Sequence, residues 1–302
     1  MPSVPVPRDR NWSRPRDRRW RIAMRADTPA GQVVAALARD TPAFRDCGPQ
    51  LDGLLAALAR TAPDPGVAGS RGGVPPKTRA ELVRAIQAGV DLLGADLTGV
   101  DLADAVLDRA HLARARLTRA DLSRAQLVGA DLTRADLYRA RLDDADLRAA
   151  RLAHADCNQA RMRKTILSGS DMVRANLMQA DLFQAVLGHA DLTRALLWKT
   201  DLLSADLSHA VLHKAKIVGA RLTFARLVEA DLTDATLRAA KLNSADLTGA
   251  DLRGARLWLA DLDGTRLDGA TWSSGTRWPR KMTEQIRARS DEVAPKVYEV
   301  VR

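Results

Sequence analysis

The side chains that most often carry out chemistry are scattered through this sequence. Its five histidines are His111, His154, His189, His209 and His213, and its two cysteines are Cys47 and Cys157. Nucleophilic catalysis needs a nucleophile beside a base, and a zinc site needs several His, Cys or carboxylate ligands that converge. His189 and His209 stand 20 residues apart, but two exposed histidines do not make a metal site. No glycine-rich phosphate loop is present either. We therefore predict no catalytic residues, no metal site and no cofactor.

A period of five residues organises the middle of the chain. If the apolar residue of each unit is taken as its centre, centres fall at every fifth residue from 92 to 272, which gives 37 units. Leucine occupies 32 centres, and alanine occupies 31 of the positions two residues earlier. We predict that the centres form the core, including Leu97, Leu132, Leu252 and the five that are not leucine, which are Cys157, Met162, Met172, Ile217 and Trp272.

This period fits neither regular secondary structure. Five residues of α-helix rotate a side chain by about 140°, so the leucines would spiral over every face. A plain strand would send alternate leucines to opposite faces. Only a chain that turns a corner every five residues keeps each leucine and alanine pointing inward, which predicts a solenoid with short sides.

The units themselves are close to a known motif. Ala95-Asp96-Leu97, Ala130-Asp131-Leu132 and Ala250-Asp251-Leu252 resemble the A-(D/N)-L-x-x units of the pentapeptide-repeat proteins. The resemblance implies an all-β solenoid, a right-handed quadrilateral parallel β-helix with four units per coil. The 37 units then give about nine coils. It also implies that Trp272, at the last centre, closes the core.

Four segments are expected along the chain. Residues 1–30 are rich in Arg and Pro and predict a disordered basic arm. Residues 31–89 predict a helical N-terminal region whose last helix, at 78–88, caps the first coil. Residues 90–274 form the repeat, and 275–302 form a tail that we expect to be helical and to cover the other end or mediate self-association.

At 20 residues per coil, one outward position carries mostly cations. We call it the basic stripe, and it consists of Arg114, Arg134, Arg174, Arg194 and Lys214. One interpretation is a stripe that binds phosphates. The other is a solvated row whose cations pair with aspartates of the next unit, as Arg134 would with Asp136.

A second outward position carries the largest apolar side chains. We call it the apolar column, and it contains Tyr138, Met178, Trp198, Val218 and Trp258, with Leu196 and Leu259 nearby. These are either residues of a partner or dimer surface, or apolar side chains exposed singly by chance.

Charge separates two functional hypotheses. The chain has a net charge of +10, but residues 90–274 hold 25 Lys and Arg against 25 Asp and Glu. The resemblance implies, as one alternative, an acidic DNA mimic that binds DNA gyrase or another type II topoisomerase and protects it from poisons. A neutral repeat argues against that role. We favour a non-catalytic scaffold that binds a protein partner or forms a homodimer.

The remaining expectations concern location and other partners. Trp12 and Trp20 lie among the arginines of the arm, a combination that suits single-stranded nucleic acid, but we favour an unstructured solubilising tail. No run approaches the ~18 apolar residues of a membrane helix, so we expect no membrane association. The low cysteine content favours the reducing cytoplasm.

Overall fold

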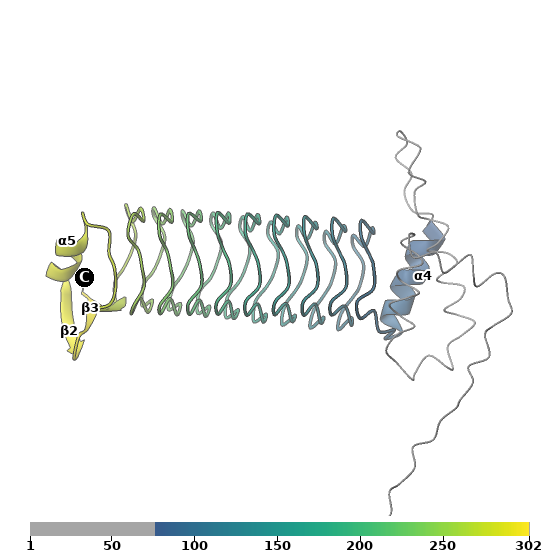
Figure 1. The fold of residues 1–302 in the computed structure, drawn as a ribbon, viewed down its shortest axis with the longest axis horizontal. Coiled ribbons are helices and arrows are strands. Elements are labelled where there is room, and N and C mark those ends of the chain that lie inside the picture. The colour runs from purple at the N-terminus through teal and green to yellow at the C-terminus, as the bar shows by residue number, and fades with distance from the viewer. Residues whose placement is uncertain (1–75, 302) are drawn as a thin grey trace, which may run out of the picture. The chain divides into compact units, whose positions relative to one another are not determined.

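The fold comes from a computed structural model that describes residues 76–301. These residues fall within the unit Ala68–Arg302. The expected basic arm at 1–30 and the helices expected within 31–60 lie outside the described residues. The repeat is a stack of coils, with α4 at one end and β2 and β3 at the other (Figure 1).

The coils are held in a parallel register of 20 residues. Bridges join Asp96 to Arg116, Asp101 to Asp121, and so on to Asp251 and Thr271. The N–H of each centre from Leu92 to Leu257 donates to a carbonyl in the next coil, as Leu102 does to Asp121 at 2.7 Å. The residue before each centre donates backwards, as Asp121 does to Val100 at 2.9 Å. Four five-residue sides therefore make one coil, and the repeat is a β-helical solenoid.

Each side ends in a corner with a fixed backbone geometry. The N–H of Ala105 donates to the carbonyl of Leu102 at 3.2 Å, which closes a tight turn. The second turn residue, Asp104, has φ of +59°. The same left-handed conformation recurs at every fifth residue from 94 to 269. These corners keep the centre and the preceding alanine on the inside.

The interior consists of stacked leucines and alanines. The structure buries all the centres named above, from Leu97 with 4% exposure to Leu132, Cys157, Met162 and Met172 with none. Ile217, Leu252 and Trp272 are also buried. Thr165 and Thr200 replace alanine at inward positions, and each hydroxyl donates to a backbone carbonyl, those of Leu142 and Leu177, at 2.8 and 2.7 Å. At these two positions the buried hydroxyl has a hydrogen-bond partner, whereas the hydroxyl of Ser170, which also replaces alanine on the inside, has none among the described residues.

Helix α4, Pro76–Gln87, lies against the first coils. Leu82 and Ile86 are buried in the common core. The Arg79 guanidinium donates to the carbonyl of Ala103, and Gln87 Nε2 donates to that of Val106 at 3.3 Å. The helix expected at 78–88 is thus present, and it covers apolar rungs that would otherwise be exposed.

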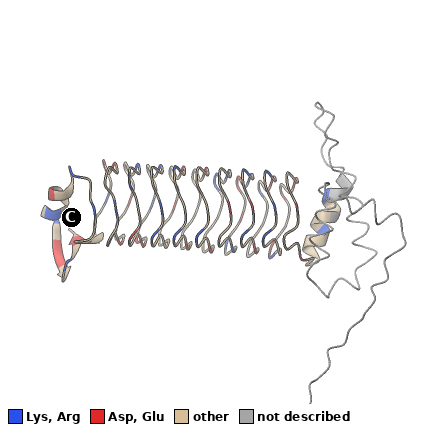
Figure 2. Cartoon of the chain, viewed as in Figure 1, with Lys and Arg blue, Asp and Glu red and all other residues tan. Residues whose placement is uncertain are grey.

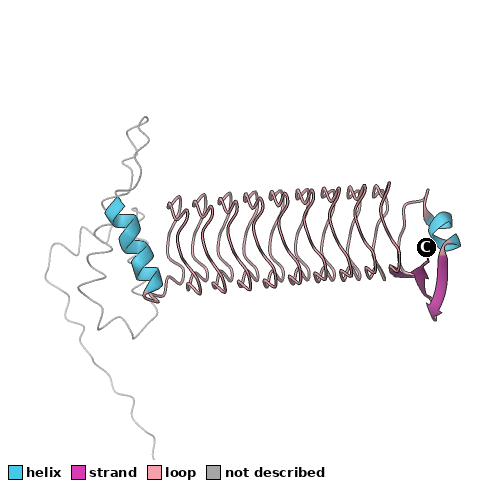
Figure 3. Cartoon of the chain, turned by 180° about the vertical axis from the view of Figure 1, so that it is seen from behind, coloured by secondary structure: helices cyan, strands magenta, loops and turns pink. Residues whose placement is uncertain are grey.

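The C-terminal tail differs from the expected helix. Only α5, Thr283–Ala288, is helical there, and β2, Ser290–Ala294, and β3, Val297–Val300, follow it. They join β1, Thr271–Ser273, in an antiparallel sheet of order β1-β3-β2 (Figure 3). The physical reason is that the last side of the solenoid, β1, offers backbone groups that a strand can pair with. The β-branched residues Val293, Val297 and Val300 suit that role.

The tail also closes the core. The Trp272 ring stacks on Tyr298 with centroids 4.4 Å apart and meets Trp278 edge-on at 6.1 Å. Trp272 Nε1 donates to Ser290 Oγ at 3.0 Å. The last centre is therefore covered by side chains of the tail.

Candidate interaction face

One side of the solenoid carries both outward positions that the sequence singled out. In the coil around Leu196, the side begins at corner residue Arg194, runs through Ala195, Leu196 and Leu197, and ends at corner residue Trp198. Ala195 and Leu197 are fully buried, so the three residues between and beside them point outward. The basic stripe and the apolar column are therefore the two edges of a single side.

Between these edges runs a third row that sequence reasoning missed. We call it the central column, and it holds the bridged residues Asn176, Leu196, Lys216, Thr236 and Arg256. The sequence contained a signal for this row. Alternate residues of an extended segment point to the same surface, so the residue midway between the two edges of a side must also point outward. The basic stripe, the central column and the apolar column together are called the basic-apolar face below. Leu259, which is 66% exposed, directly follows Trp258 at the same corner and lies one residue outside this face.

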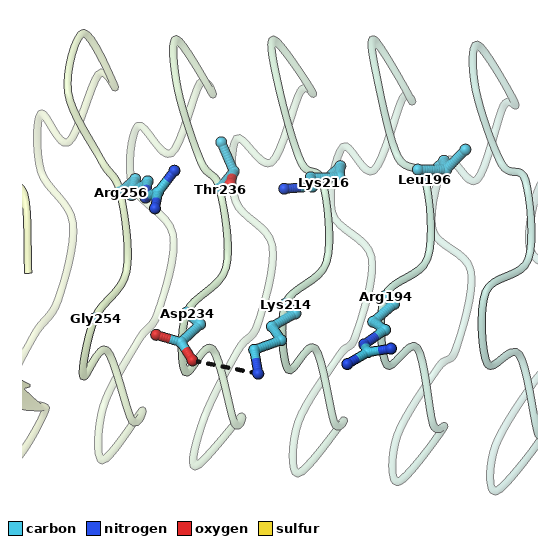
Figure 4. Close-up of a pocket in the computed structure, with 8 residues that line it drawn as sticks. All are labelled: Arg194, Leu196, Lys214, Lys216, Asp234, Thr236, Gly254 and Arg256. Atoms are coloured by element: carbon cyan, nitrogen blue, oxygen red, sulfur yellow. Dashed lines mark ion pairs between the residues drawn. The ribbon is translucent and has the colours of Figure 1, made fainter.

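A shallow groove of about 550 Å³ lies between the basic stripe and the central column. Its lining residues are Arg194, Leu196, Lys214, Lys216, Asp234, Thr236, Gly254 and Arg256. Figure 4 shows them in two rows of four, with one residue of each row on each successive coil. The small alanines between the rows, such as Ala195 and Ala215, are buried, which leaves the groove open to solvent.

The cations of the basic stripe do not find the aspartates expected for them. Within residues 76–301, only Lys214 of this stripe has an ion pair, to Asp234 at 3.9 Å (Figure 4). Asp136 does not pair with Arg134. It accepts hydrogen bonds from Thr118 Oγ1 at 2.8 Å and from the Tyr138 N–H at 3.0 Å. The stripe is thus a row of mostly unneutralised charges.

Other sides neutralise their arginines more fully. Arg221 lies 2.7 Å from Asp201, and Arg124 forms a forked pair with Asp104 at 2.7 Å. Such exposed pairs stabilise a protein by at most about 1 kcal/mol each. Their main effect here is to lower the positive electrostatic potential of these sides, and their effect on stability is small.

The apolar column is exposed where its side chains are largest. Trp198 is 47% exposed and Trp258 is 45% exposed, while Leu196 of the central column is 36% exposed. Tyr138, Met178 and Val218 are half-buried. The Arg238 guanidinium lies 4.6 Å from the centre of the Trp258 ring, so one face of that indole already has a partner. Trp198 has no aromatic or cationic partner among the described residues.

Charge is divided unevenly among the sides, although both signs occur along the whole solenoid (Figure 2). In the repeat, the basic-apolar face has nine Lys and Arg residues against four aspartates. The side that precedes it along the chain has three arginines against seven acidic residues. Five of these acids form an acidic column, which consists of Asp131, Asp171, Asp191, Asp231 and Asp251. A repeat with no net charge therefore has one basic and one acidic side.

The histidines and cysteines form no reactive group in the described part of the chain. The rings of His189 and His209 stack with centroids 4.7 Å apart, and His209 Nδ1 lies 3.3 Å from Glu229. No three His, Cys, Asp or Glu side chains among residues 76–301 could hold a metal ion together. Burial raises the pKa of the Cys157 thiol to about 12, so this thiol is protonated near neutral pH. It serves as a small apolar core residue.

Residues 76–301 contain no helix with the length and hydrophobicity needed to span a membrane.

Comparison with known proteins identifies the repeat. A family model described as "Pentapeptide repeats" matches eight times, and the matches together run from residue 78 to 269. No curated protein sequence is significantly similar to the chain.

Several solved structures are similar to it. HetL, a pentapeptide-repeat protein involved in heterocyst differentiation regulation in the cyanobacterium Nostoc sp. strain PCC 7120, is 33% identical. The match covers 66% of this chain and 98% of HetL, with a TM-score of 0.40. Rfr23 from the cyanobacterium Cyanothece 51142 is 32% identical over 36% of this chain and 63% of Rfr23, with a TM-score of 0.22. QnrB1, a plasmid-mediated fluoroquinolone resistance protein, is 17% identical over 56% of this chain and 90% of QnrB1, with a TM-score of 0.40.

Proposed function

This chain belongs to the pentapeptide-repeat family, and we propose that it is a non-catalytic scaffold whose basic-apolar face binds a protein partner. The observation that carries the proposal is the pair of exposed indoles, Trp198 and Trp258, on one column. Tryptophan is among the residues most enriched at binding hot spots, and large exposed apolar groups on one surface mark interaction sites. A homodimer formed through this face is one form of the same proposal.

The test removes both indoles without touching the core. The double variant Trp198→Ala, Trp258→Ala keeps every inward residue, so it should fold normally. We expect partner recovery in an affinity pull-down to fall at least tenfold, or the homodimer to dissociate in sedimentation. Phe224→Ala is the matched control, because Phe224 is 60% exposed at a corner on a different side. If the double variant retained both partner recovery and oligomeric state, the proposal would fail.

The second candidate is a DNA mimic that binds a type II topoisomerase, and the acidic column supports it. Its aspartates form a row of negative charges along the solenoid, interrupted by Arg151 and Val211, and such a row could take the place of DNA phosphates. The neutral repeat as a whole weighs against it, which is why we rank it second.

A gyrase supercoiling assay, with and without a fluoroquinolone, tests this alternative. Inhibition or protection at low micromolar protein, lost in the variant Asp171→Asn, Asp191→Asn, would place the DNA mimic first. The asparagines can keep the turn hydrogen bonds, as Asn176 does with the Met178 N–H at 3.2 Å, while the charge is removed. The protein-partner proposal predicts no effect on supercoiling.

A further inference from the structure

We infer that the three coils spanning residues 174–218 of the basic-apolar face dock an acidic amphipathic α-helix of a protein partner. This inference rests on the proposed function and specifies its partner. The site has two edges of different chemistry. Arg174, Arg194 and Lys214 form one edge, and Met178, Trp198 and Val218 form the other, with Leu196 and Lys216 between them.

The cations at this site are available to a ligand. Within the described chain, the side chains of Arg174, Arg194 and Lys216 have no ion pair, hydrogen bond or ring contact. Lys214 has only the long 3.9 Å pair to Asp234. A partner carboxylate therefore replaces water at these cations and breaks no strong internal ion pair. Charge complementarity of this kind steers association and fixes the orientation of a partner.

The apolar edge lies on the same side of the solenoid as these cations, with the central column between the two edges. Trp198 and Leu196 are exposed in the same coil as Arg194, with Met178 in the coil before and Val218 in the coil after. A ligand with carboxylates along one flank and aliphatic or aromatic groups along the other matches both edges at once. A helix with acidic residues on one side of an apolar stripe has this arrangement.

Spacing favours a helix that lies along the axis of the solenoid. Neighbouring coils are separated by about 4.7–4.9 Å, the distance between adjacent strands. One turn of an α-helix advances about 5.4 Å. Over three coils the mismatch stays near 1 Å, which long Arg and Lys side chains absorb. A ligand in an extended conformation matches less well, because its same-face residues repeat at about 6.8 Å and fall out of step with the coils after fewer repeats.

Acidic residues limit the site at both ends. Asp156 occupies the central column in the coil before Arg174, and Asp234 occupies the corner in the coil after Lys214. They restrict the run of cations to three coils, enough for two to three helical turns. A single-stranded nucleic acid fits less well, because Trp198 is the one ring of this site on which a base could stack. Leu196, Met178 and Val218 offer no further stacking surface, and the acidic ends repel a continuing phosphate chain.

Direct binding of a designed peptide tests the inference on the full-length chain. The probe is a fluorescent helical peptide of about four turns, with Glu on one flank and Leu on the other. A second peptide carries Lys in place of Glu, and a third has the first peptide's composition in scrambled order. We expect the Glu peptide alone to bind, to weaken with salt, and to shift tryptophan emission to the blue in a manner lost in Trp198→Ala.

Charge reversal provides the decisive comparison. The variant Arg194→Glu, Lys216→Glu should bind the Glu peptide at least tenfold more weakly and should now bind the Lys peptide. The matched control Lys164→Glu, Lys241→Glu changes the net charge equally on other sides, where both lysines are exposed, and should bind as the parent does. Equal losses in both variants, or no binding of the Glu peptide below about 1 mM, would overturn the inference.

Two further outcomes separate this inference from the proposed function. If the Trp198→Ala, Trp258→Ala variant loses its partner but charge reversal has no effect, the scaffold role stands and the acidic helix is wrong. If a single-stranded oligonucleotide competes with the Glu peptide and binds more tightly, with the same dependence on Arg194 and Lys216, the ligand is a nucleic acid and the inference fails.

Discussion

The residue before each centre is often aspartate, and the structure gives the reason. Its carboxylate accepts the backbone N–H two residues later, as Asp101 does from Ala103 at 3.0 Å. That N–H has no partner in the ladders between coils. Where another residue takes the position, a carboxylate from the neighbouring coil can substitute, as Asp108 does for the Val128 N–H at 2.9 Å. Aspartate at this position is thus part of the turn, whatever else its charge does.

These carboxylates make stability depend on pH. For Asp251, burial raises the pKa, but hydrogen bonds from the Arg253 side chain and N–H and the Arg253 charge outweigh it, so the pKa is lowered overall. The pKa of Asp246 is lowered as well, since the Thr248 hydrogen bonds and the nearby arginines outweigh its desolvation. A folded pKa below the unfolded value of about 3.9 stabilises the fold above that pH. The contribution is lost as the pH falls through the folded value.

We therefore expect the free energy of unfolding to decrease as the pH is lowered below about 4. In Asp246→Asn, Asp251→Asn the decrease should be smaller, because two of the titrating groups are gone while the amide oxygens can still accept the turn hydrogen bonds. Urea unfolding followed by circular dichroism across this range measures both slopes. Identical slopes for the variant and the parent would contradict the assignment.

The corners impose a second rule at the residue scale. Ala239 has φ of +53° and is exposed, whereas the next residue, Ala240, is buried. An L-residue in the left-handed region costs about 1–2 kcal/mol, and glycine avoids that cost but has more freedom when unfolded, by about 0.4–1 kcal/mol.

Ala239→Gly should therefore stabilise the protein by about 0.5 kcal/mol, the difference between these two effects. Ala240→Gly should destabilise it by about 1–2 kcal/mol, because it removes a buried methyl group and adds the same unfolded-state freedom. Denaturant midpoints of the two variants decide the matter. A loss of stability in Ala239→Gly would show that the strain of the corner conformation is smaller than the unfolded-state freedom that glycine adds.

At the scale of elements, the two ends of the solenoid are closed by different means. At the first coil, α4 contributes Leu82 and Ile86 to the core. At the last coil, β3 pairs with β1, and Tyr298 lies against Trp272. A helix covers apolar rungs but cannot pair with a strand, whereas the tail strands do both. The tail therefore also provides hydrogen-bond partners for backbone groups of the last side. For example, the N–H of Val300 donates to the Ala270 carbonyl at 2.9 Å.

Removal of Trp272 should be costly because it opens the core at this end. We expect Trp272→Ala to lower the free energy of unfolding by about 3–5 kcal/mol. Trp272→Phe keeps a ring against Tyr298 and loses the hydrogen bond to Ser290, so the loss should be about 1–2 kcal/mol. Chemical denaturation measures both. Equal losses would show that ring packing at this end does not stabilise the fold.

At the scale of the whole repeat, inward and outward residues obey different periods. The interior repeats every five residues, but an outward column repeats every 20. Removal of any number of whole units therefore preserves the pattern of the core. Only removal of four units, or a multiple of four, keeps the outward residues before and after the deletion in the same columns. The arrangement of function on the surface is thus separable from folding.

Two deletions make this separation measurable. Deletion of 220–239 removes one coil and leaves Trp198 and Trp258 on the same side, whereas deletion of 220–229 moves Trp258 to the opposite side. We expect both proteins to fold, with similar circular dichroism spectra and cooperative melting. Deletion of 220–229 should abolish binding of a partner that contacts both indoles. Deletion of 220–239 only brings Trp258 one coil closer to Trp198 and should weaken the binding less. Misfolding of the shorter deletion alone would show that outward residues also set the register.

The sequence by itself determined the interior of this protein. Every unit buries the same two positions, so a local pattern of Leu and Ala was sufficient to predict the solenoid and its core. The helix that covers the first coil was predicted separately, from the local helix signals of residues 78–88. Side-chain size and backbone sterics act within one unit, and that is why the pattern could be interpreted without a structure.

Only the tertiary structure decided what lies on the outside and at the C-terminal end. It joined the basic stripe and the apolar column into one face, left Arg194 and Lys216 without ion pairs, and made strands of a tail that was expected to be helical. Each of these outcomes depends on residues about 20 positions apart in sequence, or on a free sheet edge. Long side chains such as arginine reach several acceptors from one position, so their partners follow from three-dimensional arrangement rather than from local sequence.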